Sequence, residues 1–230
     1  MKIKLPLGFF RKGMRISVHP KPIGQGGPQG AAPNTPPPPP QSDDVLLHKK
    51  TTPALIDSLQ DVDPFVRSVA AEVLGRMREK SSIESLIAAL KDHSKYVREK
   101  AAIALGHIGD RSAVPALIEA LNDESEEVRV TVAGVLGHLR DRLAVPALIS
   151  SLSDPSPMAR MKTAISLGII GDPEAVTPLY GALNDENELV RKYTCEALGN
   201  IGRLAVPALL LALRNERVRA HAAQALTKIK

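Results

Sequence analysis

The residues of this chain that could support chemistry are few, and two of them are histidines with a regular spacing. His107 and His138 stand 31 residues apart, so they would occupy equivalent sites if the chain repeats with that period. Two imidazoles without a third ligand or a carboxylate in register make a poor metal site. A histidine near the C-terminal end of a helix is favoured by the helix dipole, which accounts for both. We therefore predict no metal site, and no motif indicates another cofactor.

The chain has a single cysteine, Cys195, which excludes an intramolecular disulfide. Its equivalents at the 31-residue spacing are all alanines: Ala71, Ala102, Ala133 and Ala164. A column of small residues predicts a buried position, and a nucleophilic thiol would need an adjacent base that the sequence does not place. No glycine-rich loop follows a strand pattern, as nucleotide binding would require. The chain is therefore predicted not to be an enzyme.

Three residue types recur at the same spacing, so a repeated element must position them. We call them the Arg column (Arg67, Arg98, Arg129, Arg160, Arg191), the Asp column (Asp61, Asp92, Asp123, Asp154, Asp185) and the Gly column (Gly75, Gly106, Gly137, Gly168, Gly199). A sixth copy, which contains Leu213 and Arg219, is shortened. A fixed period of about 20–50 residues indicates stacked supersecondary units.

Each copy contains two helical patterns. The first is short, as in residues 114–121, where Pro115 suits the first turn of a helix. The second follows a column of good N-cap residues: Asp63, Ser94, Ser125, Ser156 and Asn187. Apolar residues then recur at helical spacing. The sequence therefore predicts an all-α fold, a right-handed α-solenoid of six helix–turn–helix repeats over residues 51–230.

Residues 1–50 differ from the rest in charge and composition. They hold eight basic and two acidic residues, a formal charge of +6, whereas residues 51–230 hold 22 basic and 23 acidic residues, a charge of −1. Ten of the 19 prolines also lie in the first 50 residues. Such a segment buries too little apolar surface to offset its ordering entropy. We therefore predict that residues 1–50 form a flexible, disordered basic arm. The solenoid itself is not expected to bind nucleic acid.

The arm begins with apolar and cationic residues that could form a short docking motif: Lys2, Lys4, Phe9, Phe10, Arg11 and Lys12. An acidic protein surface, an anionic membrane surface or nucleic acid would each suit it, and a simple solvated tail is the alternative. The apolar stretch at the start is too short for a signal peptide. No apolar run is long enough to span a membrane. A cytoplasmic location is therefore predicted.

The repeated residues resemble a known family. The segment Asp-Glu-Ser-Glu-Glu-Val-Arg at 123–129, followed by residues 133–137, and its equivalents in the other copies are similar to the HEAT superfamily, specifically the short HEAT-like repeats named after phycobilisome lyases. The resemblance implies that the second helices line the concave side of the solenoid. It also implies that the Asp and Arg columns pair within or between neighbouring units, which gives them a structural role.

The family includes scaffolds, bilin lyase subunits and metal-dependent hydroxylases. Its deoxyhypusine hydroxylase branch carries His-Glu pairs directly after the Val-Arg dipeptide to hold iron. In this chain the corresponding pairs are Ser68-Val69, Glu99-Lys100, Val130-Thr131, Met161-Lys162, Lys192-Tyr193 and Ala220-His221. None is a His-Glu pair, so the resemblance predicts that hydroxylase activity is absent.

Positions that vary between copies are free to serve a partner. The positions one, five and nine residues after the Arg column point away from the apolar face of each second helix. They supply the partner-binding candidates: Glu99, Ile103, His107, Val130, His138, Met161, Ile165, Ile169 and Lys192. In the fourth copy all three positions are apolar, and the first and fifth copies are polar at these positions. This pattern suits a partner helix or extended peptide, unless the strip packs against the N-terminal segment or a neighbouring helix.

The sequence thus favours a non-enzymatic scaffold or adaptor for protein–protein interaction. The alternative is a subunit of a bilin lyase or of another chromophore-handling complex, which rests on the repeat resemblance. Tethering to nucleic acid or a membrane through the basic arm is a third hypothesis.

Overall fold

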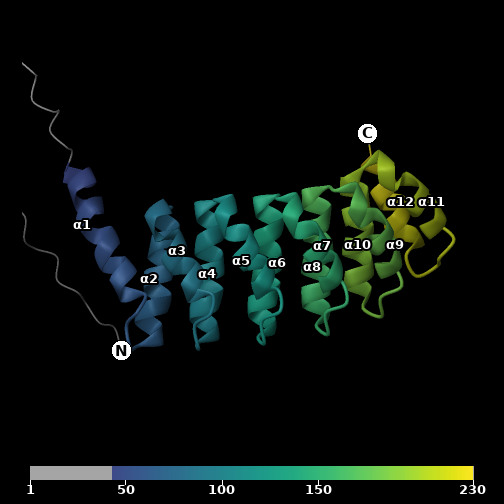
Figure 1. The fold of residues 1–230 in the computed structure, drawn as a ribbon. Helices are drawn as coiled ribbons and strands as arrows, with labels where there is room; N and C mark the ends of the chain where they lie inside the picture. The colour runs from purple at the N-terminus through teal and green to yellow at the C-terminus, as the bar shows by residue number, and fades with distance from the viewer. Residues whose placement is uncertain (1–42, 230) are drawn as a thin grey trace, which may run out of the picture. The chain divides into compact units, whose positions relative to one another are not determined.

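The computed structural model describes residues 43–229, which belong to one structural unit (Figure 1). The candidate docking residues of the arm, from Lys2 to Lys12, lie outside the described residues. Among the described helices, none is long and apolar enough to cross a membrane.

Twelve α-helices and five short 3-10 helices make up the described part of the chain, which contains no strand. The α-helices are α1 (Asp43–Ser58), α2 (Pro64–Met77), α3 (Ile83–Ala89), α4 (Lys95–Ile108), α5 (Val114–Ala120), α6 (Glu126–Leu139), α7 (Val145–Ser151), α8 (Pro157–Ile170), α9 (Val176–Ala182), α10 (Glu188–Ile201), α11 (Val206–Ala212) and α12 (Arg219–Thr227). Consecutive helices pair into six units, each with a first and a second helix. The predicted all-α solenoid is confirmed.

Helix α1 differs from the other first helices, which have seven residues each. It has 16 residues and includes Pro53, although proline lacks the amide hydrogen that a helix interior uses. The Thr52 hydroxyl donates a hydrogen bond to Glu79 Oε2 at 3.1 Å and so ties α1 to the end of α2. The change in composition near residue 50 therefore falls inside a helix, which starts at Asp43.

The ends of the second helices follow from local sequence. Ser156 caps α8, since its Oγ accepts hydrogen bonds from the amides of Met158 and Ala159 at 3.1 and 3.3 Å. Gly109 and Gly171 end α4 and α8 with φ of 74°, in the left-handed region that glycine enters without strain. Helix α8 is thus capped at both ends, whereas Ser94 and Ser125, at the starts of α4 and α6, make no side-chain capping bond.

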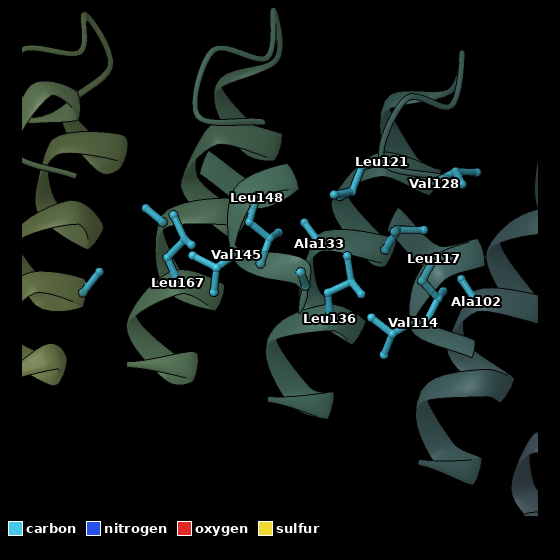
Figure 2. Packing of buried hydrophobic residues seen from close by; sticks show 14 of the residues in the cluster. Ala102, Val114, Leu117, Leu121, Val128, Ala133, Leu136, Val145, Leu148 and Leu167 are labelled. Carbon is cyan, nitrogen blue, oxygen red and sulfur yellow. The ribbon is translucent and has the colours of Figure 1, made fainter. Parts of the chain in front are cut away.

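The hydrophobic core runs through the units as a continuous line. Figure 2 shows Ala133 and Leu136 of α6 between residues of the first helices α5 and α7, among them Leu117 and Leu148. These leucines are completely buried. Burying a leucine side chain contributes about 1.5–3 kcal/mol. Each unit therefore stabilises its two neighbours, as expected of a repeat protein.

The Gly column sets the distance between second helices. A Cβ atom added at Gly168 would lie 2.6 Å from the Cα of Ala197 in α10, and one at Gly75 would lie 2.5 Å from the Cα of Ala104 in α4. Real Cβ atoms essentially never approach that closely. At these two positions the next second helix occupies the space of a side chain, whereas the nearest atoms at Gly106 and Gly199 lie at 3.0 and 3.2 Å and leave slightly more room.

Candidate interaction surface

The Arg and Asp columns form a series of equivalent ion pairs between neighbouring units, which we call rungs. Arg98 Nε and Nη2 donate to the two carboxylate oxygens of Asp123 at 2.7 and 2.8 Å. Arg98 Nη1 donates to the carbonyl oxygens of Asp92 and His93 in its own unit. The same pattern joins three further pairs: Arg67 to Asp92, Arg129 to Asp154 and Arg160 to Asp185. Each rung therefore fastens the loop of one unit to the loop of the next.

The rung carboxylates also order the loops that contain them. Asp92 Oδ1 accepts a hydrogen bond from the Ser94 amide at 2.8 Å, which positions the start of α4. The hydrogen bonds from Arg67 hold the pKa of Asp92 below its ordinary value, so the carboxylate is ionised at neutral pH. The charged groups of the rung side chains are used in contacts within the protein. Paired in this way, they are structural and offer no free group for catalysis.

A second series of ion pairs lies at the opposite ends of the helices, and sequence reasoning missed it. Lys80 Nζ lies 3.9 Å from Asp110 Oδ2, and Arg111 Nε lies 3.8 Å from Asp141 Oδ2. Arg142 forms the third pair with Asp172. The aspartates repeat every 31 residues and cap the 3-10 helices that precede the first helices. The 31-residue spacing of these aspartates could have revealed the series from the sequence.

The partner-binding candidates lie on one side of the stacked second helices, which we call the second-helix face. Of the candidates, His107 and His138 are exposed, and Ile169 is 37% exposed. The remaining candidates are half-buried: Glu99, Ile103, Val130, Met161, Ile165 and Lys192. Exposure therefore increases toward the C-terminal ends of the helices.

The structure adds exposed side chains to this face that the sequence reasoning did not include. Tyr96 is 65% exposed and Met158 is 48% exposed, and both lie two residues before the Arg column. Phe65 and Leu189 hold the same position in α2 and α10 and are also exposed. This position precedes that of Ile165 by seven residues, which at about 100° per residue places it within about 20° of the same direction. The helical period could have revealed this position from the sequence.

Charged pairs lie on the second-helix face on the N-terminal side of its apolar part. Lys100 Nζ lies 2.6 Å from Glu72 Oε2, which joins α4 to α2. Lys95 Nζ lies 2.7 Å from Glu127 Oε1, which joins α4 to α6. The hydrogen bond from Lys95, followed by that from Ser125, lowers the pKa of Glu127 to about 2. The ionised Glu127 therefore lies on α6, the helix that packs against the N-terminal side of α8.

The side chains that could hold a metal ion or act as a nucleophile are the next feature of the described residues. Among them, no three His, Cys, Asp or Glu side chains gather in a way that could hold a metal ion. Cys195 is buried, and its burial, with a smaller contribution from the charge of Glu196, raises the pKa of the thiol to about 11. At neutral pH Cys195 is thus a protonated thiol packed in the core. What the surface offers is contact area for another molecule.

The comparisons with known proteins agree with this architecture. The family model for HEAT repeats matches residues 52–126 and 114–188, and the model for a single HEAT repeat matches residues 175–205. Among curated protein sequences, none matches the chain significantly.

Two solved structures illustrate the similarity. The complex of CpcE and CpcF of phycocyanin lyase from Nostoc sp. PCC7120 is 27% identical, with a TM-score of 0.60, over 85% of this chain and 80% of that chain. A designed armadillo repeat protein in complex with the peptide (KR)4 is 22% identical, with a TM-score of 0.55, over 78% of this chain and 99% of that chain. The second likeness concerns the fold alone. The HEAT-repeat model matches residues 52–188, which are more than half of this chain. The chain therefore belongs to the HEAT-repeat family.

Proposed function

We propose that this chain is a protein-interaction scaffold that binds a helix or an extended peptide on the second-helix face. The supporting observation is that the constant positions and the variable positions of the repeat lie in different places. Most members of the Arg, Asp and Gly columns, which are constant between copies, make contacts between units. The positions that vary between copies are the ones that reach the surface. A surface that changes from unit to unit can recognise an irregular partner.

The arrangement of the helices supports a groove on this side. Second helices of successive units contact each other far more extensively than first helices do. In a curved stack the more crowded side is the inner side, so the second helices would line the concave surface. A concave surface contacts a bound helix or peptide over several units at once, which increases the buried area.

The apolar centre of the face supports a partner with apolar anchors. Met158, Ile165 and Ile169 lie on α8, and the ionised pairs of Lys95 and Lys100 join α4 to α6 and to α2, on the N-terminal side of α8. Interfaces commonly combine an apolar centre with a polar rim. The partner segment would therefore place two or three apolar side chains against α8 and polar groups at either side.

Adding a charge at the apolar centre is expected to weaken partner binding. Partner proteins are captured with the full chain from its source extract and identified, and the affinity of a recovered partner is then measured. Ile165→Asp and Ile169→Asp should each weaken that affinity at least tenfold, about 1.4 kcal/mol, because each would bury a carboxylate against apolar groups. Ser150→Asp adds the same charge on the exposed side of the first helix α7 and should leave the affinity unchanged.

Circular dichroism separates lost binding from lost folding in this experiment. Ile165 is half-buried, whereas Ile169 is more exposed and lies in the last turn of α8, so Ile169→Asp retains the fold more readily. If folded Ile169→Asp binds the recovered partner as tightly as the unaltered chain does, the proposed use of this face is wrong.

A second candidate is a subunit of a bilin lyase, which the similarity to the CpcE and CpcF complex favours because it extends over 85% of this chain. Co-expression with a bilin and its acceptor protein distinguishes the two functions. The scaffold proposal predicts that the purified chain is colourless and that the acceptor gains no pigment beyond the level obtained without the chain. Pigment carried by the chain, or transferred faster in its presence, would favour the lyase.

A further inference from the structure

Arg191 differs from the other members of the Arg column because its rung lacks a carboxylate. Its Nη1 donates to the carbonyl oxygens of Asp185 and Glu186, both at 2.9 Å, so the guanidinium group has the orientation found in the other rungs. The residue is only 8% exposed. Its Nε is buried and has no hydrogen-bond partner within the described residues. In the four complete rungs that atom donates to an aspartate.

The sequence of the sixth unit explains the difference. Asn215 stands where the Asp column would continue, two residues after the leucine that ends the first-helix pattern. Its Oδ1 accepts a hydrogen bond from the Arg217 amide at 3.0 Å, just as Asp123 Oδ1 accepts one from the Ser125 amide. Asn215 therefore maintains the turn of the loop but supplies a neutral amide where the other units supply a carboxylate.

A second guanidinium group lies at the same place. Arg217 Nη2 lies 3.5 Å from the carbonyl oxygen of Asp185, the same oxygen that accepts the bond from Arg191. The neighbouring carboxylates of Asp185 and Glu186 both pair with Arg160, so Arg191 receives only a longer-range attraction from Asp185. Within residues 43–229, neither Arg191 nor Arg217 forms an ion pair. Two cations that share one carbonyl oxygen repel each other, and a bound anion would relieve that repulsion.

We propose that the junction of the fifth and sixth units is a binding site for a carboxylate side chain of an acidic segment in a partner protein. A carboxylate suits the pair because guanidinium groups donate strong charge-assisted hydrogen bonds to carboxylates, as in the four complete rungs. Arg191 supplies the buried half of the site, and the exposed Arg217 supplies the half that faces solvent.

The charge of the surrounding loop favours an acidic segment in particular. Residues 213–219 contain three arginines, Arg214, Arg217 and Arg219, and one acidic residue, Glu216. The equivalent loop of the third unit, residues 121–129, instead contains four acidic residues and one basic residue, Arg129. An acidic segment would therefore be attracted to the sixth unit and repelled by the third, which fixes where along this edge it binds. This site is separate from the second-helix face.

Supplying the missing carboxylate from the chain itself tests the proposal. The probe is a fluorescein-labelled eight-residue peptide of glycine and serine that carries three aspartates, and its binding to the full chain is followed by fluorescence anisotropy. Asn215→Asp should weaken binding at least tenfold, because its carboxylate would occupy the two guanidinium groups. Asn184→Asp, which adds the same charge at an exposed side chain 3.5 Å from Asn215, should change the affinity less than threefold. Arg217→Ser should weaken binding at least threefold.

The outcomes that overturn the proposal are equally specific. They are an equal loss in Asn215→Asp and Asn184→Asp, equal binding of a control peptide with asparagine in place of aspartate, or no binding of the aspartate peptide. Free acetate that binds as tightly as the peptide would also overturn it, since it would show a site for small anions only. Thermal melting gives a second readout. Asn215→Asp should melt at a higher temperature than the unaltered chain. An unchanged melting temperature would show that Arg191 is already compensated, which contradicts the proposal.

Discussion

Asp123→Asn is expected to lower the free energy of unfolding by about 3 kcal/mol. Both members of this rung, Arg98 and Asp123, are only 7% exposed in their side chains. The substitution keeps the oxygen that bonds to the Ser125 amide but places a neutral amide against a buried guanidinium group. Removing one partner of a buried ion pair costs about 3–5 kcal/mol, and the low end applies here because Arg98 keeps its exposed partner Glu124 at 3.1 Å. Urea denaturation measures the change.

A double-mutant cycle separates the lost pair from other effects of the substitution. In an Arg98→Met background, Asp123→Asn should cost less than about 1 kcal/mol, because no buried cation remains to be compensated. Glu119→Gln serves as the surface control, since Glu119 pairs with Lys91 in an exposed position and such pairs contribute about 0–1 kcal/mol. A loss below about 0.5 kcal/mol for Asp123→Asn would contradict the structural role assigned to the rungs.

Gly168→Ala is expected to destabilise the protein by about 2–3 kcal/mol, although alanine is the better helix former. The added methyl group would lie 2.6 Å from the Cα of Ala197, so α8 and α10 would have to separate. Overpacking of this kind costs about 1–3 kcal/mol, and backbone atoms cannot move aside as a flexible side chain can. Thermal or urea denaturation of the full chain measures the effect.

Gly181→Ala is the matched control and should have the opposite sign. Gly181 lies inside the helix α9, and no atom stands within 4 Å of the position that its Cβ would occupy. Alanine should therefore stabilise the protein by about 0.5–1 kcal/mol through its helix propensity. If both substitutions change stability in the same direction, close packing of the second helices is not what requires the Gly column.

Most of the fold could be predicted because six copies of one sequence pattern form the same kind of unit. The spacing of Arg98, Gly106 and their equivalents gave the period, and the N-cap column gave the starts of the second helices. The start of α1 could not be predicted in this way, because residues 43–50 have no counterpart in the other copies. Proline at position 53 also argued locally against a helix that extends from Asp43 to Ser58.

The candidate surface was predicted less completely than the fold. Counting forward from the Arg column found Ile165 and Ile169 but missed Tyr96 and Met158, which lie before it on the same side of their helices. Spacing alone also could not determine which unit supplies the aspartate to each arginine, since that depends on how the units stack. The uncompensated Arg191 became apparent only from its contacts, although Asn215 already broke the Asp column in the sequence.

The central claim is that a partner binds the second-helix face, and hydroxyl-radical footprinting of the full chain with a recovered partner tests it most directly. Tyr96 and Met158 are exposed on that face, whereas Tyr180 is exposed on the first helix α9. Binding should reduce oxidation of Tyr96 and Met158 at least threefold and leave Tyr180 unchanged. Protection of Tyr180 together with unchanged oxidation of Tyr96 and Met158 would contradict the claim.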